Sequence, residues 1–155
     1  MKIFIMRHGE AESLAQSDDQ RALTERGQND SVAVAQACVS EHGPVVFDKV
    51  LVSPYLRAQQ TWDAISAHFS AHSVENCDDI TPYGQAENVH DYLLAIAEHE
   101  SLENILIVSH LPLVGYLVSE FVADLPAPMF TTSSLYCVDF QIDSQAGEVL
   151  WSVRP

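Results

Sequence analysis

The sequence predicts an α/β fold, a three-layer αβα sandwich with a mostly parallel central sheet and a C-terminal antiparallel edge hairpin. Two observations predict it. Short apolar runs of strand length alternate with segments of helical periodicity, an alternation typical of parallel sheets covered by helices. Two further strand-like runs, 134–140 and 147–153, are joined across a short turn, as in a hairpin. The 155 residues predict one domain, 1–155, that buries roughly 70% of its unfolded surface.

The first part of the chain contains two strand–helix pairs. Residues 2–6 form a short apolar run of strand length. Residues 24–41 have the apolar face of an amphipathic helix, and Thr24 is a suitable N-cap for it. The β-branched segment 49–53 predicts a buried strand, and Pro54 then favours the start of a second helix because its fixed backbone angle suits the first helical position.

The second helix and the elements after it follow from the same patterning. We expect the second helix to run to about residue 69, with four apolar side chains facing inward: Leu56, Trp62, Ile65 and Phe69. Residues 87–99 have helical character, and residues 104–109 form the clearest buried strand of the chain. Pro112 favours a further helix that ends before the proline-containing segment 125–128.

The charge and cysteine content limit the possible partners and compartment. Seven Lys and Arg residues against 22 Asp and Glu residues leave a net charge of −15. Bulk electrostatics therefore disfavour binding to nucleic acid or to an anionic membrane. The apolar N-terminal run is too short for the core of a signal peptide. Three widely spaced cysteines predict free thiols in a reducing compartment, so we expect a cytoplasmic protein. The default expectation for the oligomeric state is a monomer.

Polar residues follow three of the predicted strands at the point where each strand ends. Arg7 and His8 follow the first strand, Arg57 follows the second, and His110 follows the strand at 104–109. Ligands of open parallel sheets bind beyond the carboxyl ends of the strands. If these strands are neighbours, two arginines and two histidines converge on one edge, and Arg57 also lies on the first turn of a helix, which favours an anion.

The basic residues are few enough to be followed one by one. Four fall elsewhere, at the starts of strands, within a helix or near the C-terminus: Lys2, Lys49, Arg26 and Arg154. Three remain for this edge of the sheet: Arg7, Arg21 and Arg57. The arginine side chain offers phosphate a planar fork of hydrogen-bond donors. This distribution predicts a small anion site with a phosphoryl group as its ligand.

Each of these residues also has an ordinary structural interpretation. Arg7 and Arg57 suit surface ion pairs, His8 suits a loop cap, and His110 suits a satisfied core histidine. Their joint placement favours the functional interpretation, because unrelated surface residues need not all follow the ends of strands.

The remaining titratable clusters favour no site. His68 and His72 have a spacing of four residues, which suits a metal ion, but no third ligand is near them in the sequence. The simplest interpretation of six acidic residues is that they lie on the solvated surface, at positions 10, 12, 18, 19, 78 and 79.

The motif Arg7-His8-Gly9 after a first strand resembles the signature of the histidine phosphatase superfamily, which includes the phosphoglycerate mutases. Segments 23–27 (LTERG), 53–61 (SPYLRAQQT) and 108–110 (VSH) support the resemblance and occur in the family's order. Two longer blocks resemble the small bacterial phosphohistidine phosphatases of the SixA type: SHLPLVGYLV at 109–118 and PMFTTS at 128–133.

This resemblance implies a role for each residue of the predicted site. His8 is the implied nucleophile, the phosphoryl group is held by Arg7, Arg57 and His110, and Arg21 matches a further arginine of the small subfamily. No metal or other cofactor is implied. The implied function is a protein phosphohistidine phosphatase that removes phosphate from a phosphotransfer domain or phosphocarrier through a phospho-His8 intermediate.

The general acid of larger family members has no recognisable counterpart, although Asp79 and Glu87 lie in the right region. A phosphohistidine substrate tolerates its absence, because neutral imidazole, whose conjugate acid has a pKa of about 6.5, is a better leaving group than an alkoxide. A usable acid at either position would favour a broad-specificity phosphomonoesterase instead. A non-catalytic module that binds phosphoproteins is the third possibility.

No long insertion is available to form a lid, so an open site is expected.

Overall fold

The computed structural model describes residues 1–155 and contains a mixed sheet of six strands in the order β5-β3-β6-β1-β7-β8. The strands are β1 (Lys2–Arg7), β3 (Lys49–Val52), β5 (Val74–Asn76), β6 (Asn104–Ser109), β7 (Leu135–Gln141) and β8 (Ala146–Val153). The four strands β5, β3, β6 and β1 run parallel, whereas β7 is antiparallel to β1 and to β8. This architecture confirms the predicted fold class, including the edge hairpin of β7 and β8.

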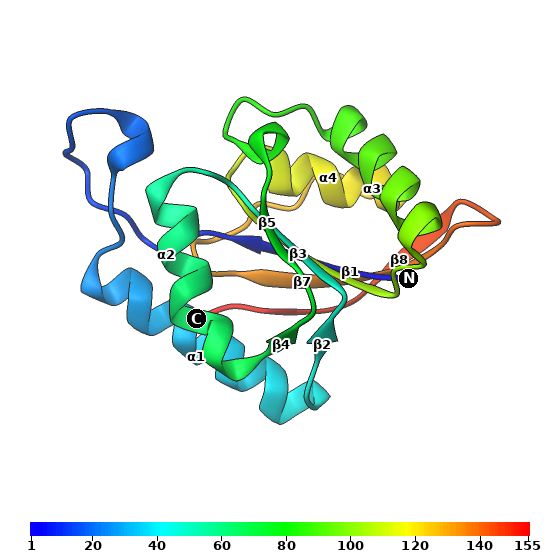
Figure 1. Cartoon of the computed structure of the whole chain (residues 1–155), viewed down its shortest axis with the longest axis horizontal. Coiled ribbons are helices and arrows are strands. Elements are labelled where there is room, and N and C mark those ends of the chain that lie inside the picture. The colour runs from blue at the N-terminus through cyan, green and yellow to red at the C-terminus, as the bar shows by residue number, and fades with distance from the viewer.

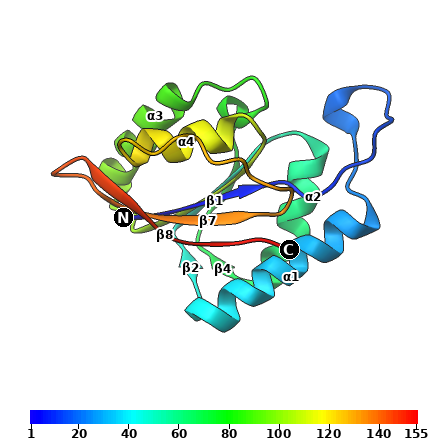
Figure 2. The ribbon, with the colours of Figure 1, turned by 180° about the vertical axis from the view of Figure 1, so that it is seen from behind.

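Four helices cover the two faces of the sheet: α1 (Glu25–His42), α2 (Leu56–Ile65), α3 (Ala86–Glu100) and α4 (Leu113–Phe121). The helices α3 and α4 lie on one face, and α1 and α2 lie on the other (Figures 1 and 2). The smaller elements are the two-stranded sheet of β2 (Val46–Phe47) and β4 (Ser70–Ala71), and the 3-10 turns η1 (Asp18–Gln20), η2 (Ser66–His68) and η3 (Asp78–Ile80). None of the helices combines the length and apolar character needed to cross a membrane.

The central strands are buried on both sides because their alternate side chains enter two different cores. Ile3 and Ile5 pack with α3 and α4, whereas Phe4 and Met6 pack with α1 and α2. Such alternation follows from the two-residue repeat of an extended strand. It explains why the first strand appears in the sequence as a continuous apolar run rather than as an alternating pattern.

The start of α1 agrees with its predicted cap, but the expectation for the second helix was partly wrong. The hydroxyl of Thr24 accepts a hydrogen bond from the Gly27 amide at 2.9 Å. Helix α2 begins at Leu56 rather than at Pro54. Its first backbone hydrogen bonds end on the carbonyl of Tyr55, which is therefore the cap residue. Pro54 suits a helix start by its backbone angle, but here it lies in a bend that precedes the cap residue.

The inward face of α2 also differs from the prediction. Ile65 is buried, and Trp62 and Phe69 pack against the same core, although Phe69 lies beyond the end of the helix. Leu56 lies outside the core. Arg57 and Thr61 are buried on this helix instead. The apolar pattern missed them because the helix turns polar side chains toward the end of the sheet.

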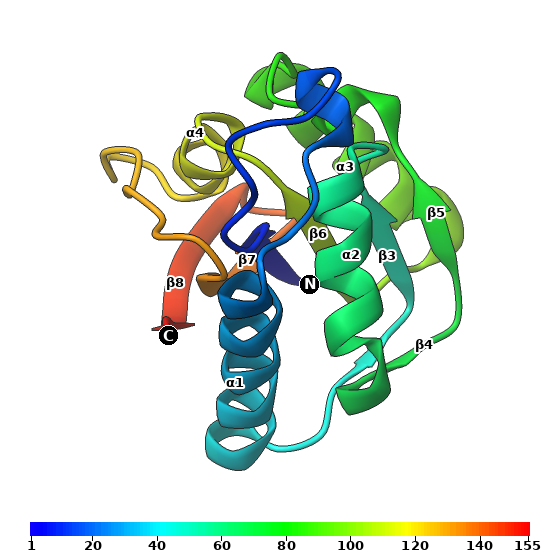
Figure 3. The same ribbon diagram turned by 90° about the vertical axis from the view of Figure 1, so that its left-hand side faces the viewer.

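The register of the parallel strands brings the ends of β1, β3 and β6 together. Arg7 pairs with Ser109, and Val52 pairs with Val108. The residues that follow these strands therefore leave the sheet side by side. The segment between β1 and α1, which contains η1, extends past the N-terminal end of α2 at this same edge (Figure 3).

Candidate active site

His8 lies at the centre of the residues that gather beyond the strand ends. Its backbone amide donates to the Ser109 carbonyl at 2.9 Å, and its own carbonyl accepts from the Ser133 amide at 3.1 Å. The ring nitrogen Nδ1 lies 2.7 Å from the carbonyl oxygen of Gly9. Because a carbonyl oxygen only accepts, Nδ1 bears the proton and Nε2 keeps its lone pair in the neutral ring. The local backbone thus determines which nitrogen is available to react.

The surroundings of His8 keep its ring neutral. The pKa of His8 is lowered to about 4, mainly by burial; the positive charges of Arg57, Arg7 and Arg21 act in the same direction, and the Gly9 hydrogen bond opposes them. A neutral imidazole at physiological pH follows. Only the neutral form has the lone pair that a nucleophile needs.

Arg57 extends from the first turn of α2 and is buried beside His8. Its Nε donates to Nε2 of His8 at 3.3 Å. Its Nη1 donates to the backbone carbonyl of Asp18 at 2.7 Å, and its Nη2 donates to Oδ2 of Asp18 at 3.2 Å. The guanidinium also lies 5.0 Å from the centre of the Tyr55 ring, within the range of a cation–π contact. These contacts hold one edge of the arginine against Nε2 of His8.

Arg7 and His110 each present a buried nitrogen that has no hydrogen-bond partner. Arg7 Nη1 donates to the carbonyl of Phe130 at 2.9 Å, which leaves Nε unpaired. Nε2 of His110 lies 2.7 Å from the Ser53 hydroxyl, which leaves Nδ1 unpaired. An unpaired buried polar atom is costly, so a hydrogen bond from Arg7 Nε to an anion would be favourable, as would one from His110 Nδ1 when that nitrogen bears a proton.

His110 is packed against His8, with 5.0 Å between the centres of the two rings. Burial lowers the pKa of His110 to about 2, and interactions with His8 and Arg57 contribute to the same direction. His110 is therefore neutral before an anion binds. A phosphoryl dianion close to Nδ1 would shift this balance toward the protonated ring, because an adjacent negative charge favours the charged form.

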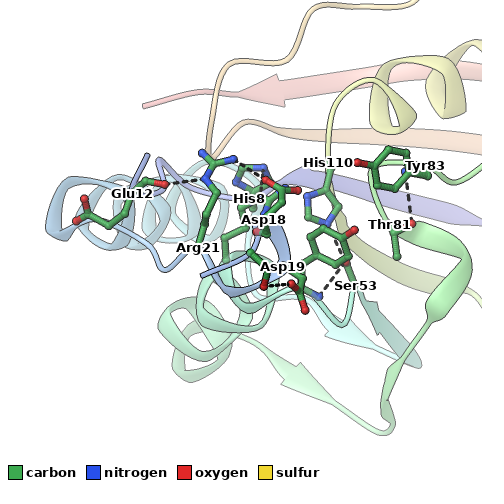
Figure 4. Close-up of polar contacts among 12 residues, drawn as sticks. His8, Glu12, Asp18, Asp19, Arg21, Ser53, Thr81, Tyr83 and His110 are labelled. Atoms are coloured by element: carbon green, nitrogen blue, oxygen red, sulfur yellow. Dashed lines mark hydrogen bonds and ion pairs between the residues drawn. The ribbon is translucent and has the colours of Figure 1, made fainter. Parts of the chain in front are cut away.

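Arg21 joins the cluster through Asp18, a residue that was expected to belong to a solvated acidic surface. Arg21 Nε donates to the Glu12 carbonyl at 2.7 Å, and Arg21 Nη1 donates to Oδ1 of Asp18 at 3.0 Å (Figure 4). The Asp18 carboxylate thus bridges Arg21 and Arg57. Asp18 is exposed, as expected, but its pairing with the two arginines was missed because a charge pattern does not show that a loop returns to the sheet edge.

Three further residues support the site without having been selected from the sequence. Thr61 accepts a hydrogen bond from the Gly9 amide at 3.0 Å. Ser53 contacts His110, and the Phe130 carbonyl contacts Arg7. Thr61 and Ser53 could have been found because they lie within the motif at 53–61. The Phe130 carbonyl could not, because every residue has a backbone carbonyl and the sequence does not show which one contacts an arginine.

Both carboxylates considered as a general acid are exposed. Asp79 lies in η3, and Glu87 lies on the first turn of α3. Neither makes a hydrogen bond or ion pair with the residues around His8: Arg7, Arg57 and His110.

The remaining bases and histidines lie apart from His8. Arg26 is exposed and pairs with Glu10 and Asp30 at 3.7 and 3.6 Å. Lys49 is held between Glu75 and Glu100 at the start of β3. His68 ends η2, and His72 follows β4, so the two do not share a helix face.

Comparison with known proteins agrees with this geometry. The model of the histidine phosphatase superfamily (branch 1) matches residues 3–87, which include His8 and Arg57. Phosphohistidine phosphatase SixA of Escherichia coli K12 is 39% identical over 156 residues, which cover 100% of this chain and 94% of the relative. The chain belongs to the histidine phosphatase superfamily.

Two further comparisons refine the position of the chain within the superfamily. The SixA homolog of Haemophilus influenzae is 44% identical over 126 residues, covering 77% of this chain and 76% of the relative. The solved structure of the protein histidine phosphatase SixA complexed with tungstate covers 100% of this chain and 97% of its own, with a TM-score of 0.91 at 39% identity. These similarities confirm the resemblance to the small SixA-type branch.

Proposed function

We propose that this superfamily member is a protein phosphohistidine phosphatase that acts through a phospho-His8 intermediate. The observation that carries the proposal is the position of the His8 Nε2 lone pair, which lies next to Arg57 in a cluster with two buried nitrogens that lack partners, on Arg7 and His110. The names of the SixA relatives agree with this activity. The protein–tungstate structure adds a solved relative in complex with a tetrahedral oxyanion.

The first step transfers the phosphoryl group from the substrate to His8. Nε2 of His8 attacks phosphorus, the bond between phosphorus and the substrate nitrogen breaks, and the electron pair of that bond stays on the substrate imidazole. Arg7, Arg57 and His110 hold the phosphoryl oxygens, and Arg21 adds positive charge at the edge of the site. Such positioning and charge stabilisation provide most of the catalysis of phosphoryl transfer.

The second step transfers the group to water. A water oxygen attacks phosphorus, and the phosphorus–Nε2 bond breaks with its electron pair returning to Nε2. The two protons of the water leave on the inorganic phosphate, and His8 regains its neutral form with the proton on Nδ1. The bond from Nδ1 of His8 to Gly9 persists through both steps and keeps the ring in one orientation.

The proposed substrate is a phosphorylated histidine on a phosphotransfer domain or phosphocarrier protein of a phosphorelay. Its leaving group is a neutral imidazole once the second ring nitrogen is protonated, so the reaction needs no strong acid from the enzyme. The exposure of Asp79 and Glu87 and their lack of contact with the cluster support this choice over a phosphomonoesterase. We further propose a single domain that works as a monomer in the cytoplasm, where its three free cysteines would stay reduced.

The test is phosphate release from a histidine-phosphorylated phosphotransfer domain, with a small phosphomonoester in parallel and His8→Ala as the control. We expect release from the phosphoprotein only, and its loss in His8→Ala. Efficient release from the ester would contradict the phosphohistidine assignment and favour the broad phosphatase. Binding of the phosphoprotein without release by either variant would indicate a binding module.

A further inference from the structure

Asp18 places an anion on the same arginines that the proposed function assigns to the phosphoryl group. Its two carboxylate oxygens accept from Arg57 Nη2 at 3.2 Å and from Arg21 Nη1 at 3.0 Å. Its backbone carbonyl accepts from Arg57 Nη1 at 2.7 Å. The hydrogen bond from Arg21, followed by those from Arg57, lowers the pKa of Asp18, so the carboxylate is charged at neutral pH.

The phosphoryl group and Asp18 must compete for one guanidinium. Arg57 Nε lies 3.3 Å from His8 Nε2, the atom that attacks phosphorus in the proposed mechanism. Oxygens of a phosphoryl group at that nitrogen therefore lie against the guanidinium whose Nη2 is bonded to Asp18. A phosphoryl dianion and a carboxylate around one guanidinium repel each other at short range.

The loop that contains Asp18 can release the carboxylate without disturbing the core. The turn η1 has no buried residues. Its loop is closed at the base by the bond from the Glu12 amide to the Ala22 carbonyl at 2.8 Å and by the bridge between Ala11 and Leu23. The hydrogen bonds between η1 and residues outside the loop all come from Arg57. Displacement of the Asp18 side chain therefore breaks one ion pair with the body of the protein.

We propose that the Asp18 carboxylate competes with phosphate for Arg57 and Arg21. Its hydrogen bonds to these arginines break when a phosphoryl group binds and form again when inorganic phosphate leaves. The proposal rests on the proposed function and adds a specificity-determining residue to it. Free phosphate and small phosphate esters have few other contacts with which to offset this competition. A phosphoprotein has a surrounding interface, so the competitor disfavours the small anions selectively.

The experiment measures the binding of inorganic phosphate by titration calorimetry to the wild-type chain, Asp18→Asn and Asp19→Asn. Asparagine at position 18 keeps the size of the side chain and the backbone bond to Arg57. Asp19 is the matched control, because it is the neighbouring carboxylate in η1 and its side chain bonds only Ser17 and Gln20. We expect phosphate to bind Asp18→Asn about tenfold more tightly than wild type, and Asp19→Asn to stay within about twofold.

Weaker phosphate binding in Asp18→Asn would overturn the proposal, because it would mean that the carboxylate positions the arginines for the ligand. Equal affinities in Asp18→Asn and Asp19→Asn would overturn it as well. Both results leave the proposed function intact. A lack of phosphate binding by all three proteins would overturn this inference, whereas the proposed function is tested separately by phosphate release from the phosphoprotein. Damage to the fold cannot imitate the expected result, which is a gain of affinity.

Discussion

At the scale of single residues, the orientation of His8 depends on a short chain of hydrogen bonds that begins on α2. The Thr61 hydroxyl donates to the Arg57 carbonyl at 2.8 Å and accepts from the Gly9 amide at 3.0 Å. The Gly9 carbonyl in turn accepts from Nδ1 of His8 at 2.7 Å. All four residues are buried, so water does not replace a lost partner readily. Thr61 therefore acts on His8 through the backbone of Gly9.

Replacement of Thr61 by valine tests this chain. Thr61→Val keeps the shape but leaves the Gly9 amide buried without an acceptor, which costs about 1–3 kcal/mol of unfolding free energy. We also expect slower phosphate release, because the carbonyl that orients His8 shifts with its own amide. Urea unfolding and phosphate release from the phosphoprotein are the measurements. Thr61→Ser keeps the hydroxyl and should preserve both, and an unchanged turnover in Thr61→Val would contradict the role.

At the scale of elements, the first turn of α1 fixes the path of the chain after β1 by close contact of two backbones. The Glu10 carbonyl accepts from the Thr24 amide at 2.9 Å. A Cβ atom on Gly27 would lie 2.1 Å from that same oxygen, and one on Gly9 would lie 2.6 Å from the Gly27 carbonyl. Glycine at both positions permits this approach, which ties the segment of His8 to the helix.

Gly27→Ala forces α1 and the segment after β1 apart. The new methyl group would meet the backbone of Glu10, which cannot move aside as a side chain does. We therefore expect the free energy of unfolding to fall by about 1–3 kcal/mol. Phosphate release should fall with it, because the displaced segment includes Gly9 and Glu10. Ser40→Ala, at an exposed position of the same helix, is the control for helix propensity. Full stability of Gly27→Ala in thermal and urea unfolding would show that the close approach is not required.

At the scale of the whole molecule, the fold places three arginines and two neutral histidines at one sheet edge of a chain with a net charge of −15. Folding lowers the pKa of His8 to about 4 and that of His110 to about 2, mainly through burial. In acid, the unfolded chain therefore binds protons at these two histidines that the folded chain does not bind. By linkage, stability decreases as the pH falls below about 6.5, the ordinary pKa of histidine.

This linkage predicts acid sensitivity that can be assigned to single residues. Between pH 7 and pH 5 the free energy of unfolding should fall by about 2 kcal/mol for each of the two histidines. His110→Asn should lower the free energy of unfolding at both pH values. The decrease in that free energy from pH 7 to pH 5 should, however, be about 2 kcal/mol smaller in His110→Asn than in wild type, because one of the two histidines is gone. Urea unfolding at the two pH values measures this difference, with His72→Asn at an exposed loop position as the control. The same fall in His110→Asn as in wild type would refute the assignment.

Much of the fold could be predicted because its elements have regular periods. The buried strands at 2–6 and 104–109 appear as apolar runs, and Thr24 marks the start of a helix by its capping chemistry. The strand β5 was not predicted, since three exposed residues at a sheet edge have no apolar pattern. The early end of α2 was missed because the 3-10 turn η2 continues its polar and apolar spacing.

The sequence by itself determined the alternating layers and the residues that follow each strand end, because both depend on local periodicity and on the common direction of parallel strands. It therefore predicted that His8, Arg7, Arg57 and His110 leave the sheet at one edge. Only the tertiary structure decided that Asp18 returns to Arg57 across 39 positions of the chain. The loop between them has no repeating pattern, and its path depends on contacts that form only when α2 packs beside the end of β1.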